Sequence, residues 1–147
     1  MEAERVIRLL GLVPHPEGGH YRETWRATEK RSGRAIASAI YFLLKRDEVS
    51  AWHRVDATEM WHFYAGTPLE LRVAEDGARP PAHWVLGPDV AVGERPQLVV
   101  PAGAWQSARS MGDWTLVGCT VTPAFRFEGF ELAPDGWEPG RGPSARG

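Results

Sequence analysis

Cysteine is nearly absent from this sequence of 147 residues, and this excludes two common ways of stabilising a small fold. With Cys119 as its only cysteine, the chain cannot form an internal disulfide bond or hold zinc through a cysteine cluster. Cys119 lies in the apolar run 116–121, where a thiol packs as a small hydrophobic side chain more often than it acts as a nucleophile. We therefore expect a buried Cys119 and a reducing compartment, the cytoplasm.

Long hydrophobic runs and a strong excess of one charge are also lacking. No stretch approaches the roughly 20 apolar residues of a membrane span, and Glu2 and Glu4 argue against a signal peptide. The formal net charge is −2, from 17 basic and 19 acidic residues, which does not suggest a nucleic-acid surface. Lys30, Arg31 and Arg34 lie together, and we expect them at a solvated loop tip. The composition predicts a soluble protein with neither a nucleic-acid nor a membrane partner.

Turn-forming residues are abundant and divide the chain into short segments. One helix is predicted over 2–10, with Gly11 as its C-terminal cap. Strands are predicted over 20–28, 35–44, 50–55, 59–66, 69–73, 83–86, 97–100, 105–108, 114–122 and 125–132. This pattern predicts an all-β sandwich or barrel, with a jelly roll as the leading option, in a single domain over 1–133. Residues 134–147, rich in glycine and proline, are expected to form a flexible tail.

The central stretch 50–66 places one imidazole and one carboxylate among apolar residues. After a turn at 56–58, the alternation of a strand puts Glu59, Trp61 and Phe63 on one face. His53 is expected to point into the same interior from the preceding strand. Because a buried charge is costly unless another group pairs it, His53 and Glu59 are predicted to form a pair.

The spacing of these residues resembles the motifs of the cupin superfamily. His53, Glu59 and Gly66 fall on three positions of the first cupin motif, and Pro101 and Gly103 fall on the second. The chain is more similar still to the Cupin-5 branch, through residues 14–19, 21–24, 39–44, 52–54 and 116–121. The resemblance spans about residues 5–132 and implies a cupin-type jelly roll. Because cupins commonly pair edge strands, it also implies a homodimer.

The same resemblance weakens the case for a metal cofactor. Metal-binding cupins usually offer three histidines and one glutamate, and here Val55 and Gln106 occupy two of the histidine positions. An amide oxygen is a poor ligand for zinc, iron or copper. No cofactor is therefore predicted; if one divalent metal binds, its ligands would be His53, Glu59 and Gln106.

Three functions fit these residues. The first is a metal-independent isomerase or epimerase for a sugar- or nucleotide-like metabolite, with His53 and Glu59 transferring a proton and Tyr41 as candidate acid. The second is a non-catalytic protein that binds such a metabolite, and the third is a metal-dependent oxygenase or isomerase. A purely structural His53–Glu59 pair is a further alternative. The predicted ligand-binding residues are Gln106, Trp61, Phe63, Trp105, Arg22 and Glu23.

Two other groups of residues carry expectations. His15 and Glu17 lie on a segment rich in glycine and proline, which is interpreted as a turn closing the barrel rather than as a functional loop at its mouth. Trp25, Trp84 and Trp114 are predicted to fill the hydrophobic core.

Overall fold

The computed structural model describes residues 1–141. An α-helix, α1, spans Ala3–Leu10 and ends at Gly11, whose left-handed backbone (φ 67°) confirms the predicted helix and its cap. The strands are β1 (Val13–Pro14), β2 (His20–Arg26), β3 (Lys30–Arg31), β4 (Arg34–Ala35), β5 (Ser38–Lys45), β6 (Val49–Val55), β7 (Thr58–Gly66), β8 (Leu69–Ala74), β9 (Ala82–Leu86), β10 (Gln97–Val100), β11 (Trp105–Ser110), β12 (Trp114–Thr122) and β13 (Phe130–Leu132). Two short 3₁₀ helices are η1 (Val90–Val92) and η2 (Phe127–Gly129).

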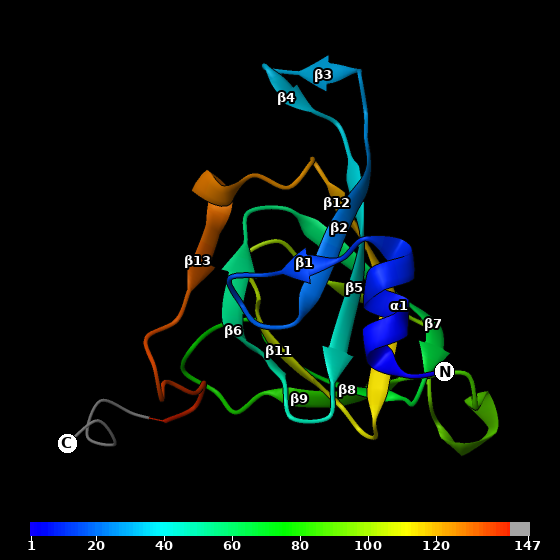
Figure 1. Ribbon diagram of the computed structural model, residues 1–147. Coiled ribbons are helices and arrows are strands. Elements are labelled where there is room, and N and C mark those ends of the chain that lie inside the picture. The colour runs from blue at the N-terminus through cyan, green and yellow to red at the C-terminus, as the bar shows by residue number, and fades with distance from the viewer. Residues whose placement is uncertain (142–147) are drawn as a thin grey trace.

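Eleven of these strands form two antiparallel sheets that pack as a sandwich, and β3 and β4 pair separately (Figure 1). The order is β1-β2-β5-β12-β7-β10 in one sheet and β13-β6-β11-β8-β9 in the other, so neighbours in space come from distant parts of the sequence. The predicted all-β jelly-roll sandwich with a short N-terminal helix is confirmed. The β3–β4 hairpin, which carries the basic loop tip, projects from one end of the sandwich (Figure 1).

The main core lies between the sheets and is built from the inward-facing residues of both. Phe42, Leu44, Trp61 and Val117 are almost fully buried there. Cys119 belongs to the same cluster at 1% exposure, so its predicted burial is confirmed. Within residues 1–141, no helix combines the length and the apolar character needed to cross a membrane.

The last predicted strand, 125–132, is largely wrong. Only Phe130–Leu132 pairs with β6, and the preceding residues leave the sheets as a turn that contains η2. The backbone N–H of Phe125 donates to the Ser38 hydroxyl, and the carbonyl of Ala124 accepts from Arg34, so side chains replace the hydrogen bonds of a strand. This segment, 123–129, therefore covers one end of the sandwich.

The predicted flexible tail does not describe residues 134–141. The Trp137 ring packs 4.6 Å from that of Trp105 and 6.1 Å from that of Trp52, and Gly140 donates to the carbonyl of Gly77. An apolar contact of this size fixes the segment against the outer face of the second sheet. The remainder of the predicted tail, 142–147, lies outside the described residues.

Two of the tryptophans predicted to be in the core lie at the surface. A β-bulge in β2 shifts the pairing between Glu23 and Trp25, which turns the Trp25 side chain outward to 54% exposure. Trp84 lies on the edge strand β9 and is half exposed. Trp114 is partly buried and packs beneath α1.

Candidate functional site

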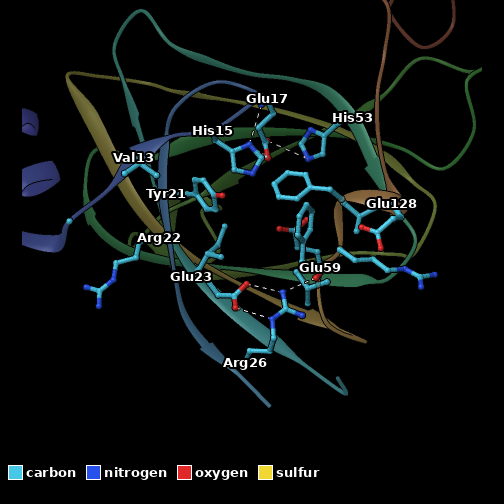
Figure 2. Close-up of a pocket in the computed structure, with 17 residues that line it drawn as sticks. Val13, His15, Glu17, Tyr21, Arg22, Glu23, Arg26, His53, Glu59 and Glu128 are labelled. Carbon is cyan, nitrogen blue, oxygen red and sulfur yellow. Dashed lines mark hydrogen bonds and ion pairs between the residues drawn. The ribbon is translucent and has the colours of Figure 1, made fainter. Parts of the chain in front are cut away.

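A cavity of about 540 Å³ lies between the sheets, at the end covered by the segment 123–129. Small-molecule sites are typically roughly 300–1,000 Å³ in volume, so the cavity has the size of a metabolite site. Its lining is Gly11, Val13, His15, Glu17, Tyr21, Arg22, Glu23, Arg26, Ile40, His53, Val55, Glu59, Val121, Phe125, Arg126, Phe127 and Glu128. Figure 2 shows His15, Glu17 and His53 gathered on one side of it and the Glu23–Arg26 pair on the opposite side.

The loop 15–19 brings Glu17 into this cavity. The N–H of Gly18 donates to the carbonyl of His15, and the N–H of His15 donates to the carbonyl of Gly19, which closes a tight turn. Gly18 (φ +109°) lies so close to the β6 backbone that a Cβ there would be 2.1 Å from the carbonyl oxygen of Val49. The N–H of Ala51 donates to the Glu17 carbonyl at 2.8 Å, so the loop is fixed directly on β6.

A second irregularity, in β6 itself, gathers the partners of Glu17. The pairing with β11 shifts between Gln106 and Ala108, which lie opposite His53 and Ser50 respectively. The extra residue in β6 lets Ser50 and His53, three positions apart, both point inward. The Ser50 hydroxyl donates to Glu17 Oε2, and His53 Nε2 lies 3.4 Å from the same oxygen. Two buried polar groups, the Ser50 hydroxyl and the His53 ring, therefore lie beside the same carboxyl oxygen of Glu17.

The tautomer of His53 follows from its other ring nitrogen. Nδ1 lies 2.7 Å from the carbonyl oxygen of Ala51, which can only accept a hydrogen bond. Nδ1 therefore carries the proton, and in the neutral ring Nε2 is the basic atom that faces Glu17. His15 has the opposite arrangement, since its Nδ1 accepts the backbone N–H of Glu17 at 3.1 Å.

Burial determines the protonation of this group. It raises the pKa of Glu17 to about 8, with the Ser50 hydrogen bond acting in the opposite direction, and it lowers the pKa of His15 to about 4. Burial also lowers the pKa of His53 and raises that of Glu59. At neutral pH the cavity therefore holds a carboxylic acid, Glu17, beside the basic nitrogen of an uncharged imidazole, His53.

Glu59 is held by a chain of buried hydrogen bonds. Gln106 Nε2 donates to Glu59 Oε1 at 2.8 Å, and Trp61 Nε1 donates to Gln106 Oε1 at 2.9 Å. Trp61 and Gln106, two of the predicted ligand-binding residues, are each 1% exposed and are not among the residues that line the cavity. Their hydrogen bonds hold Glu59 in place.

Replacing Trp61 with phenylalanine is expected to lower the free energy of unfolding by about 1.5 kcal/mol, because the amide oxygen of Gln106 loses its donor in a dry interior. Urea unfolding at pH 7 measures this. Phe42→Leu, a core change that removes no hydrogen bond, serves as the comparison. A Trp61→Phe variant as stable as the wild type would contradict the role assigned to this chain of bonds.

The other predicted site residues are dispersed. Tyr41 packs beneath α1 on the outer face of its sheet, so the prediction of an acid in the cavity is wrong for it. Trp105 lies on the opposite outer face with Arg54 4.6 Å from its ring, and Phe63 packs against the main core. Neither lines the cavity. Arg22 reaches only its edge, where it donates to the carbonyl of Leu10 and points away from the interior (Figure 2).

The cavity also contains residues that the sequence did not assign to it. Glu23 lines it as predicted, but together with Arg26, and Tyr21 lies with its ring 4.5 Å from that of His15. The sequence predicts a turn that closes the barrel at His15 and Glu17, and in the structure both side chains line the cavity. The signal for them was the pair Gly18-Gly19, because two glycines in succession permit the close approach that inserts the loop.

The donor set does not fit a metal ion. Among residues 1–141, no three histidine, cysteine, aspartate or glutamate side chains are arranged to hold one. Of the predicted ligands, Gln106 uses its oxygen for Trp61 and its nitrogen for Glu59. His53 Nε2 faces Glu17.

Two facing antiparallel sheets with a cavity between them are the architecture of jelly rolls, a class that includes the cupins. The chain belongs to the family described as Cupin_5, Cupin superfamily (DUF985), whose sequence model matches residues 4–133. The predicted family is thereby confirmed. No curated protein matches the chain.

Solved structures agree with this assignment. A protein from Shewanella oneidensis is 41% identical, with a TM-score of 0.85 over 90% of this chain and 85% of that one. A hypothetical protein from Leishmania major is 32% identical, with a TM-score of 0.85 over 93% and 90% of the two chains. Oxalate decarboxylase from Bacillus subtilis is 14% identical, with a TM-score of 0.62 over 81% of this chain and 29% of that enzyme, and this likeness concerns the fold alone.

Proposed function

We propose that this cupin binds a small metabolite in the cavity and isomerises it by proton transfer without a metal. His53 is the base and Glu17 the acid. The observation that carries the proposal is the 3.4 Å contact between His53 Nε2 and Glu17 Oε2 inside a cavity of metabolite size. Glu17 replaces Tyr41, the candidate acid predicted from the sequence, and Glu59 also lines the cavity.

The pair holds one proton and one vacant basic position at neutral pH. When His53 Nε2 takes a proton from a carbon next to a ligand carbonyl, Glu17 can give its proton to the carbonyl oxygen. A C–H bond is broken and an O–H bond forms, leaving an imidazolium and a carboxylate. Transfer of the proton from His53 to Glu17 restores both neutral groups. If the carbon that lost its proton carries a hydroxyl, the ligand is then an enediol. Glu17 gives a proton to the former carbonyl carbon while His53 takes the proton of that hydroxyl, so a C–H bond forms, an O–H bond breaks and the carbonyl group moves by one carbon.

Isomerisation fits the placement of the pair better than epimerisation does. Glu17 and His53 lie on the same side of the cavity (Figure 2), so a proton leaves and returns on one face of the ligand. Inverting a carbon centre requires a second group on the opposite face. Tyr21 is the cavity residue with a hydroxyl that could serve there, and Tyr21→Phe separates the two reactions.

Solvent exchange tests the proposal. In D₂O, the wild type is expected to accelerate the replacement of the carbonyl-adjacent hydrogens of pyruvate or dihydroxyacetone, followed by loss of the proton NMR signal. His53→Gln and Glu17→Gln should each reduce this acceleration at least ~100-fold, the effect of losing a positioned acid or base. Tyr41→Phe, outside the cavity, should not change it. Absence of exchange by the folded wild type with every probe contradicts the proposal.

Non-catalytic binding is the second candidate, favoured by the enclosed cavity itself. A bound probe at a hundred times its Kd should stabilise the protein by about 2.7 kcal/mol. A rise in melting temperature without any exchange would support this candidate. We also propose a homodimer, which the open edge strands β9 and β10 support. We propose a cytoplasmic location as well, which the single buried thiol supports.

A further inference from the structure

Arg26 faces the cavity because of the bulge in β2. Glu23 lies opposite Ile40 and Arg26 lies opposite Ser38, and these two β5 residues share the inner face of the sheet. Without the extra residue, Thr24, two positions three apart would point to opposite faces. The bulge therefore places a cation and an anion side by side across the cavity from the Glu17–His53 pair (Figure 2).

The hydrogen bonds of Arg26 leave one of its nitrogens free. Nε and Nη2 donate to the two carboxylate oxygens of Glu23, both at 2.9 Å, and Nη2 also donates to the carbonyl of Phe125 at 2.9 Å. A guanidinium has five N–H groups, and these contacts engage three of them. Within residues 1–141, the two N–H groups of Nη1 have no protein partner. The hydrogen bonds from Nε and Nη2 to Glu23 and Phe125 orient the guanidinium at the cavity wall.

Two other arginines, Arg22 and Arg126, also line the cavity. Arg126 donates from Nε and Nη2 to Asp56, which also pairs with Arg34. Arg22 donates to Leu10 and points away from the interior. Arg26 is the arginine that the bulge in β2 turns to the inner face of the sheet, opposite Glu17 and His53, so it is the cation on which the inference is built.

The charge balance favours a ligand with a single negative charge. Besides the buried Glu17 and Glu59, the lining contains the three arginines Arg22, Arg26 and Arg126 and the two carboxylates Glu23 and Glu128, a balance of one positive charge, so a phosphate dianion would bring more negative charge than these side chains leave uncompensated. A carboxylate brings one charge and accepts charge-assisted hydrogen bonds of the kind Arg26 Nη1 can donate. The lining also includes apolar and aromatic side chains, those of Ile40, Val55, Val121, Phe125 and Phe127.

We infer that the ligand of this cavity is a small monocarboxylate with a carbonyl group, whose carboxylate accepts from Arg26 Nη1 while its carbonyl-adjacent carbon faces Glu17 and His53. This inference rests on the proposed function and assigns its substrate class. Arg26 is then the residue that selects an anionic ligand. Glu23 orients the Arg26 guanidinium and disfavours a ligand with two negative charges.

Titration with three probes tests the inference. Binding of pyruvate, uncharged pyruvamide and inorganic phosphate is measured by NMR shifts of the wild type at constant ionic strength. Pyruvate is expected to bind at least ~10-fold more tightly than pyruvamide, and Arg26→Gln should weaken pyruvate binding about 10- to 100-fold while leaving pyruvamide within about twofold. Glu23→Gln should strengthen pyruvate binding several-fold, and Arg46→Gln, the same charge change on the distant Arg46–Asp113 pair, should leave it unchanged.

The outcomes separate this inference from the proposed function. If pyruvate binding depends on Arg26 but no deuterium exchange occurs, the carboxylate site is supported and the isomerase is contradicted. If exchange is unaffected by Arg26→Gln and is as fast with dihydroxyacetone as with pyruvate, the isomerase is supported and the carboxylate site is contradicted. Phosphate binding tighter than pyruvate also overturns it. If Arg26→Gln does not fold, because the Phe125 contact is lost, an unchanged affinity in Glu23→Gln counts against the inference.

Discussion

Replacing Gly18 with alanine is expected to lower the free energy of unfolding by about 3 kcal/mol. A Cβ at this position would lie 2.1 Å from the carbonyl oxygen of Val49. The backbone there has φ +109°, a conformation that residues other than glycine rarely adopt. Relief requires the loop 15–19 to move away from β6. Glu17 would then lose its contact with His53, so exchange activity should fall together with stability.

Gly33→Ala is the matched control for this change. Gly33 also has positive φ, +80°, but nothing lies within 4 Å of a Cβ built there. Its substitution should cost about 1 kcal/mol, from backbone conformation alone. Urea unfolding of the two variants measures the difference. Equal losses would mean that the close approach of the loop to β6 is not what fixes Glu17.

Several strands were predictable because turn-forming residues bound them. The bounds of β10 and β12 match the prediction, since proline or glycine residues lie close to both ends of each strand. The predictions fail where a strand contains an extra residue. The bulge in β2 reverses the faces of Trp25 and Arg26, and the bulge in β6 places Ser50 beside His53. A bulge depends on contacts with neighbouring strands, so periodicity within one segment does not show it.

The candidate site was half predictable for a similar reason. His53 and Glu59 follow from motif spacing within the one stretch 50–66, and both line the cavity. Glu17 lies more than thirty positions earlier and meets His53 only because the loop 15–19 packs on β6. Such a contact is set by tertiary packing. The sequence therefore predicted the place of His53, but its candidate acid, Tyr41, lies on the other face of β5.

Glu17 should make the protein less stable as the pH rises, and Glu17→Gln should remove this effect. Its pKa is about 8 in the folded protein against 4.5 for an ordinary glutamate, so folding favours the protonated form. The resulting stabilisation is complete below about pH 4.5 and is lost as the pH rises through 8. His15, with its pKa lowered to about 4, has the opposite effect, because its stabilisation is lost as the pH falls below 6.5.

Comparing the two proteins isolates the contribution of Glu17, since His15 and His53 titrate in both. A proton held only by the folded state changes stability by about 1.4 kcal/mol per pH unit. The free energy of unfolding of the wild type, minus that of Glu17→Gln, should therefore fall by roughly 3 kcal/mol between pH 5 and pH 8. Urea unfolding at half-unit intervals measures it. Parallel curves over this range would mean that Glu17 is ionised at neutral pH, and the cavity would then have no acid beside His53.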